Sequence, residues 1–181
     1  MKKIIILTSL FLLVGAGCTG LVKKNAETND SAQEEAVKPN LSKQEISELD
    51  QLFSVKDEES GLKTHHPTYI PEEIKLNKES VLISDSEAIG KVLTYHIGAE
   101  PGSDAPWILV QEQANSPENG TRVPSENEVD ISGLNGYGIT SKNEAGTFYH
   151  VVFTTEDNTF IKLTSKYFDI NTLAKIAKSM K

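Results

Sequence analysis

The chain of 181 residues has one cysteine, Cys18, which excludes an intrachain disulfide and a metal cluster held by several thiolates. It also lacks a long hydrophobic run, because its most apolar stretch, residues 4–14, covers 11 residues where a helix needs roughly 20 to cross a bilayer. Positive charge is scarce: 18 Lys and Arg residues stand against 26 Asp and Glu residues, for a formal net charge of −8. This balance argues against binding to nucleic acid and against electrostatic adhesion to anionic lipid.

The N-terminus has the features of an exported protein. Lys2 and Lys3 make a positive start, and the uncharged run has the length of a signal-peptide hydrophobic region. Residues 14–18, Val-Gly-Ala-Gly-Cys, resemble the lipobox of bacterial lipoproteins, which are cut just before the cysteine and lipidated on it. The resemblance implies a signal peptide over residues 1–17, a lipid such as palmitate on Cys18, and a location at the cell membrane, facing outside the cytoplasm. An uncleaved transmembrane helix and an unmodified thiol are the alternatives.

A polar segment follows the cysteine. Removal of residues 1–17 takes Lys2 and Lys3 away, which leaves 16 basic and 26 acidic residues and a net charge of −10. Residues 18–40, which carry the lipid anchor, have few large apolar side chains, so they bury too little surface to offset the entropy of ordering. We expect them to form a flexible tether, followed by a single α+β domain over residues 41–181.

The domain is predicted to begin and end with a helix. Ser42 and Glu45 have the spacing of a capping box, and the apolar residues from Ile46 to Phe53 recur with helical period. Asp169 is a predicted N-cap for a C-terminal helix with one apolar face. Between the helices, β-branched and aromatic content with period-two alternation predicts strands over residues 74–84, 89–98, 106–113, 129–132, 137–141, 147–155 and 159–165.

The connections between these strands are short, which implies antiparallel neighbours. Asn135-Gly136 has the composition of a two-residue hairpin turn, and residues 156–158 join the last two strands. We therefore expect an α+β fold with a twisted antiparallel sheet of about six to seven strands, covered by the C-terminal helix and preceded by the N-terminal helix.

One connection, residues 115–128, is long enough to be functional or mobile in a compact domain. It contains Arg122, the only arginine in the chain, and a guanidinium can bind a carboxylate or phosphate through two hydrogen bonds. Arg122 is therefore the candidate contact residue of an interaction loop, and a solvated charge is its alternative role.

Signals for catalysis or metal binding are weak. The glycines within residues 133–138 superficially suggest a phosphate-binding loop, but such a loop opens a helix and residues 139–141 continue as a predicted strand. His65 and His66 are neighbours on an extended segment and point to opposite sides, so they are poor joint metal ligands. Surface or half-buried strand positions are the default for the histidines. We predict no metal, no cofactor and no enzymatic activity.

Three stretches resemble a known domain family. They are PTYIP at residues 67–71, the pattern Val-x-Ile-x-Gly-x-x-Gly-Tyr at residues 129–137, and LAKIAKS at residues 173–179. Together they are similar to an uncharacterised family found in lipoproteins and at the extracytoplasmic end of anti-sigma-type membrane proteins of Gram-positive bacteria. The resemblance covers about residues 64–181 and implies a fold and a setting. It transfers no active site, because the family has no established catalytic residues.

These observations favour a membrane-anchored, non-enzymatic interaction or sensor module with a protein partner at the cell surface. The alternative is a carrier of a lipid or other apolar ligand in a cavity between sheet and helix. A third hypothesis, a hydrolase assembled only in space, predicts that His96 or His150 lies beside a serine and a carboxylate in a cleft.

Overall fold

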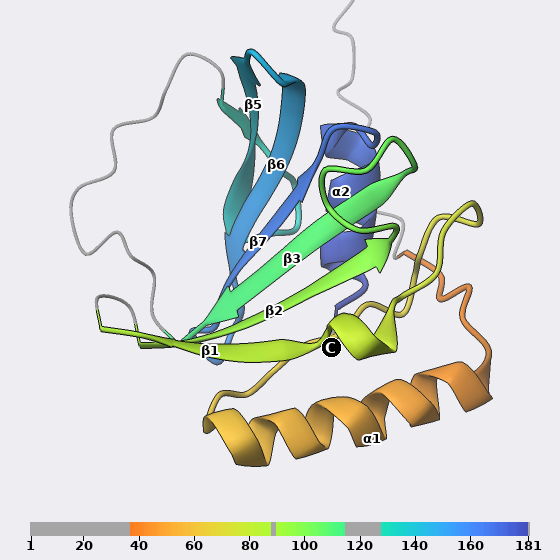
Figure 1. Ribbon diagram of the computed structural model, residues 1–181, viewed down its shortest axis with the longest axis vertical. Coiled ribbons are helices and arrows are strands. Elements are labelled where there is room, and N and C mark those ends of the chain that lie inside the picture. The colour runs from red at the N-terminus through yellow and green to blue at the C-terminus, as the bar shows by residue number, and fades with distance from the viewer. Residues whose placement is uncertain (1–36, 88–89, 115–127, 181) are drawn as a thin grey trace, which may run out of the picture. The chain divides into compact units, whose positions relative to one another are not determined.

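A computed structural model of the chain describes residues 37–87, 90–114 and 128–180 (Figure 1). Every described residue belongs to one compact unit, Glu34–Lys181.

The centre of this unit is one antiparallel sheet. Its seven strands have the order β1-β2-β3-β7-β6-β5-β4, so the last strand lies between the third and the sixth. The strands are β1 (Leu82–Ser86), β2 (Gly90–Gly98), β3 (Trp107–Gln113), β4 (Glu128–Asp130), β5 (Gly136–Asn143), β6 (Gly146–Thr154) and β7 (Phe160–Ser165). With the two α-helices of the described residues, this confirms the predicted α+β class and the antiparallel strand pairing.

The helices α1 (Lys43–Ser60) and α2 (Ile170–Lys178) begin where the sequence predicts. The Glu45 backbone N–H donates to the Ser42 hydroxyl and the Glu45 carboxylate accepts from the Ser42 N–H, which confirms the capping box. Asp169 caps α2 by accepting from the backbone N–H of Thr172 over 2.8 Å. α2 contacts β5, β6 and β7.

The first predicted strand, residues 74–84, is wrong over most of its length. Residues Lys78–Ser80 form the 3₁₀ helix η1, and the strand that follows starts only at Leu82. The Asn77 side chain accepts from the backbone N–H of Glu79 over 3.1 Å, and this local hydrogen bond competes with strand pairing. In Figure 1, α1 lies beside η1 and β1, and Lys78 of η1 forms an ion pair with Glu48 of α1.

The predicted two-residue turn at Asn135-Gly136 is also wrong. The chain turns earlier, at Gly133, which has a φ of 75°. The Asn135 carbonyl instead accepts from the backbone N–H of Thr154 over 3.0 Å, so this dipeptide continues the ladder between β5 and β6. Gly136 is needed for a different reason, because a Cβ there would lie 2.1 Å from the carbonyl oxygen of Val152.

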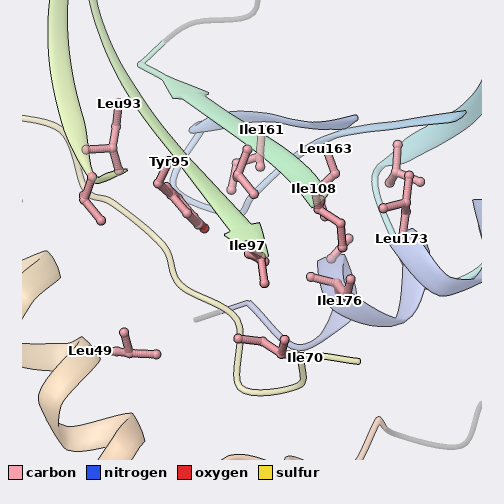
Figure 2. Packing of buried hydrophobic residues seen from close by; sticks show 14 of the residues in the cluster. Leu49, Ile70, Leu93, Tyr95, Ile97, Ile108, Ile161, Leu163, Leu173 and Ile176 are labelled. Carbon is pink, nitrogen blue, oxygen red and sulfur yellow. The ribbon is translucent and has the colours of Figure 1, made fainter. Parts of the chain in front are cut away.

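The core lies on one face of the sheet. Residues that pair across strands, such as Tyr95 with Val110 and Val110 with Leu163, point to this face together. The fully buried apolar residues of the strands are Leu93, Tyr95, Ile97, Ile108, Val110, Val151, Ile161 and Leu163. Figure 2 labels all of these strand residues except Val110 and Val151, together with Leu173 and Ile176 of α2, Leu49 of α1 and Ile70.

A set of hydrogen bonds joins the start of the domain to its end. The Asn40 amide donates to the Ile70 carbonyl over 2.6 Å and accepts from the Ile70 N–H over 2.9 Å. Thr68 in turn donates to the Ser179 carbonyl from its N–H, over 3.2 Å, and from its hydroxyl, over 2.9 Å. We call these four residues the N-terminal clamp.

Candidate functional site

A glutamate lies among the apolar side chains of the core. Glu112 shares a face of β3 with Ile108 and Val110, and its cross-strand neighbours are Leu93 and Ile161, all fully buried. Its exposed fraction is 0%, and its Oε1 atom has no hydrogen-bond partner among the residues that the structure describes. An ionised carboxylate in such surroundings needs a close cation or several hydrogen bonds.

His65 supplies this partner from the segment that follows α1. Its backbone N–H donates to Glu112 Oε2 over 2.8 Å, and its Nδ1 atom lies 3.4 Å from the same oxygen. The Tyr95 hydroxyl donates to the His65 carbonyl over 3.0 Å, so β2 and β3 both hold this residue.

The other side of the imidazole leads to the surface. His65 Nε2 lies 3.3 Å from Oδ2 of Asp157, and Lys63 Nζ lies 2.9 Å from the same oxygen. From the core outward, the order is Glu112, His65, Asp157 and Lys63, and the charges alternate in sign when the carboxylates are ionised and the imidazole is protonated. We call these four residues the relay.

Local structure fixes the segment that carries His65. α1 is followed by Gly61, whose φ of 69° lets the chain turn back toward the sheet. The Thr64 backbone N–H then donates to Asp57 Oδ1 over 2.7 Å, and the Thr159 hydroxyl donates to the Lys63 carbonyl over 3.1 Å. The segment is thus held by the last turns of α1 and by the end of the sheet.

The relay has shifted pKa values with identifiable causes. Burial raises the pKa of Glu112 to about 7, and the hydrogen bonds and charge of His65 oppose this effect only in part. Burial would lower the pKa of His65, but the hydrogen bond and charge of Glu112, with the charge of Asp157, outweigh it and raise that pKa. At Asp157 burial would raise the pKa, yet hydrogen bonds from Thr155 and Lys63 hold it well below its ordinary value.

This arrangement can hold and release protons inside the core. Both ring nitrogens of His65 face carboxylates, which stabilises the imidazolium. The two carboxylates lie on opposite sides of the ring. Within residues 37–87, 90–114 and 128–180, no three His, Cys, Asp or Glu side chains are placed to hold a metal ion.

The prediction that His65 and His66 occupy surface or half-buried strand positions is wrong. Their exposed fractions are 5% and 3%, because the segment that carries both histidines is enclosed by α1 and the sheet. The two rings do face different groups, as their adjacency predicts: His66 Nε2 lies 2.8 Å from Asp50 Oδ1, and its ring contacts that of Phe53.

Among the residues that the structure describes, the His150 ring bonds to a serine and a threonine and to no carboxylate. Its Nε2 atom is 2.9 Å from Ser141 Oγ, and its Nδ1 atom is 3.0 Å from Thr164 Oγ1. Burial lowers the pKa of His150, which favours a neutral ring with one nitrogen that donates and one that accepts, bonded to the two hydroxyl groups. The Nε2 atom of His96 lies 3.2 Å from an amide nitrogen rather than from a serine. These contacts lack the carboxylate of the triad that the hydrolase hypothesis requires.

Two of the sequence-predicted site residues, Cys18 and Arg122, lie outside the described residues. The glycine-containing stretch 133–138 enters β5 at Gly136 and opens no helix, as predicted. Glu112 was not predicted as a site residue, although the alternation of side chains along the predicted strand 106–113 places it on the same face as Ile108 and Val110.

A groove of about 690 Å³ runs along α2. Its apolar lining residues are Val37, Tyr69, Val129, Ile131, Ile170 and Ala174. Its charged lining residues are Lys38, Lys175, Lys178 and Asp130. We call this hollow the α2 groove; a second hollow, of about 590 Å³, shares Val37 and Lys178 with it.

The geometry of the relay and of the α2 groove can be set beside known proteins. No family model, curated protein or solved structure matches the chain. Within the described residues, neither helix has the length and apolar content of a membrane span. The resemblance to the extracytoplasmic domain family therefore stays a prediction, and any function has to be argued from the relay, the groove and the sequence.

Proposed function

We propose that this chain is a lipoprotein that Cys18 anchors at the cell membrane, facing outside the cytoplasm, and that its domain is a non-enzymatic interaction or sensor module. The short apolar run, the lipobox-like residues 14–18 and the single cysteine support the anchor. The proposed partners are the membrane, through the lipid, and a protein at the cell surface, with Arg122 as the candidate contact. The net charge of −8 argues against nucleic acid.

The relay is the observation that carries the sensor function. The pKa of Glu112, raised by burial to about 7, places a change of charge in the core close to neutral pH. Through His65 this change acts on the segment after α1, and through Asp157 and Lys63 it reaches the surface. The property sensed is therefore the proton activity outside the cytoplasm.

The sign of the pH dependence follows from these shifts. The raised pKa of Glu112 stabilises the fold below pH 4.5, and this contribution is lost as the pH rises through about 7. The raised pKa of His65 also stabilises the fold at lower pH, and this contribution is lost as the pH rises above 6.5. The lowered pKa of Asp157 gives a contribution that is lost only below pH 3.8, whereas the lowered pKa of His150 gives one that is present above pH 6.5 and is lost as the pH falls below that value. The relay is thus expected to stabilise the fold most at mildly acidic pH.

Glu112→Gln is expected to flatten this dependence. Glutamine keeps the shape and an oxygen for the His65 N–H, but it does not ionise. We expect the free energy of unfolding of the wild type to fall by roughly 2–3 kcal/mol from about pH 5 to about pH 8, at about 1.4 kcal/mol per pKa unit, and that of the variant to fall by much less. Urea titrations across this range measure both.

Glu100→Gln is the matched control, because Glu100 is exposed in the connection between β2 and β3. It should keep the full pH dependence, and the opposing contribution of His150 is present in all three proteins. Parallel pH profiles for the wild type and Glu112→Gln would show that the relay is not the proton-responsive element.

Cys18→Ala tests the anchor. In cells fed an alkyne analogue of palmitate, the wild type should carry the label and have a mass that fits cleavage before residue 18. The variant should carry no label and should not be cleaved at that position. Thr19→Ala, next to the cysteine, should remain labelled. A wild type without label would contradict the proposed lipoprotein.

The second candidate function is the carriage of a lipid or other apolar ligand. The observation that favours it is the α2 groove, with its apolar lining. It lies along α2, whereas the sequence suggested a cavity between sheet and helix. We also propose the finer architecture expected from the sequence, a twisted sheet with α2 over one face, which the contacts of α2 with β5, β6 and β7 support.

A further inference from the structure

The α2 groove combines an apolar floor with a line of lysines. On α2, Leu173, Ile176 and Ala177 are buried in the core, and Asn171, Lys175 and Lys178 line the groove. The spacing i, i+4, i+7 places these three polar residues on one stripe of the helix. The groove wall on α2 therefore carries a polar stripe that is positive in the last turn of the helix, at Lys175 and Lys178.

The opposite wall leaves apolar surface in water. Val129 of the edge strand β4 has an exposed fraction of 54%, which makes it one of the most exposed large apolar residues of the described chain. Its cross-strand neighbour is Gly138, and Ile170 of α2 packs on that glycine, since a Cβ there would lie 2.4 Å from Ile170 Cγ2. The missing side chain lets α2 approach the sheet, and Val129 and Ile170 both line the groove.

The charge of the groove opposes that of the chain. Acidic residues outnumber basic ones by 26 to 18 in the sequence, yet among the described residues the groove is lined by three lysines, Lys38, Lys175 and Lys178, and one acidic residue, Asp130. Its volume of about 690 Å³ falls within the range of roughly 300–1,000 Å³ that is typical of small-molecule sites. An occupant that fits the apolar lining and the positive charge of the groove has one apolar chain and one anionic group.

We infer that the α2 groove binds a single-chain anionic amphiphile of the fatty-acid type, with its acyl chain against Val129, Ile131 and Tyr69 and its anionic head at the lysines of α2. This inference rests on the second candidate function, ligand carriage. The groove is open along one side, so part of the chain stays in water, and a dissociation constant on the order of 10–100 µM is expected by comparison with the marginal binding of one acyl chain to a bilayer.

The position of the groove along the chain supports a lipid as the ligand. Val37, which lines the groove, follows Cys18 by 19 positions. A fully extended chain of that length spans at most about 65 Å, and a coil has a root-mean-square span of about 25 Å. With Cys18 lipidated, the groove stays within reach of the membrane surface, where free acyl chains are found.

Photocrosslinking tests the inference on the full chain in its own membranes. A palmitic acid that carries a diazirine on its chain is added to isolated membranes, and the crosslinked peptides are identified by mass spectrometry. We expect crosslinks in peptides that contain Tyr69, Val129 or Ile131, with competition by unlabelled palmitic acid. The double variant Lys175→Glu/Lys178→Glu should reduce them at least fivefold, and Val129→Asp should do the same because it places a charge on the apolar wall.

Lys142→Glu is the matched control, because Lys142 is an exposed lysine at the end of β5, outside the groove. It should leave the crosslinks unchanged. A diazirine-bearing palmityl alcohol, which has the chain without the charge, should label the groove far less; equal labelling would overturn the role of the lysines. Crosslinks that map elsewhere, or that the groove variants leave intact, would overturn the groove as the site while ligand carriage stands. Labelling no higher than in membranes without the protein would overturn both.

Discussion

At about pH 8, His65→Ala is expected to lose about 3 kcal/mol of unfolding free energy. The substitution removes the ring that faces Glu112 and leaves the fully buried carboxylate with the backbone N–H of residue 65 as its remaining contact from that segment. Breaking a buried pair costs more than the pair contributes, because one group remains charged and desolvated. Urea unfolding at constant pH measures the loss.

A second substitution separates this electrostatic loss from the loss of packing. Adding Glu112→Leu to His65→Ala removes the stranded carboxylate and places an apolar side chain between Leu93 and Ile161, its cross-strand neighbours. More than half of the loss should return. Lys63→Ala, at the exposed end of the relay, should have a much smaller effect, because solvent screens that ion pair. If the double variant is as unstable as His65→Ala, the charge of Glu112 is not what His65 stabilises.

Gly136→Ala is expected to cost about 3 kcal/mol or more, because its Cβ would enter the backbone of the next strand. The new atom would lie 2.1 Å from the carbonyl oxygen of Val152 and 2.5 Å from Cβ of Phe153. Gly136 pairs with Phe153, so neither strand can move away without opening the ladder between β5 and β6. Thermal or urea unfolding measures the effect.

Gly102→Ala is the matched control, because it introduces backbone strain while its Cβ clashes with no neighbouring atom. Gly102 has a φ of 94°, which is unfavourable for alanine, and no atom lies within 4 Å of its added Cβ. It should cost about 1 kcal/mol. Equal losses at the two positions would mean that close approach of the strands is not the reason for glycine at 136.

Much of the fold follows from local patterns in the sequence. The caps at Ser42 and Asp169 and most strand segments depend on short-range spacing, which is why they could be predicted. The errors occur where a side chain bonds to nearby backbone, at Asn77, or where a residue serves a long-range contact, at Gly136. A glycine after an asparagine is typical of a tight turn, and only the neighbouring strand shows that this one is needed for space.

The relay illustrates what local patterns cannot provide. The side of the sheet that Glu112 faces could be derived from β3 alone. Its partner His65 could not, because it is 47 positions away and contacts Glu112 only after the segment that follows α1 has folded against the sheet. Asp157, in the turn between β6 and β7, contacts the other side of the His65 ring and is 45 positions from Glu112. The α2 groove is similar, since its walls come from α2, from β4 and from residues near position 37.

The N-terminal clamp gives the domain a defined path for mechanical force. A pull on Cys18 reaches the described residues at position 37 and passes first to Asn40, which is bonded to Ile70, and through Thr68 to Ser179. α1 begins only at Lys43, so traction loads these few hydrogen bonds before it can unwind that helix. Because Thr68 is three residues from His65, tension on the anchor and protons at the relay act on the same short segment.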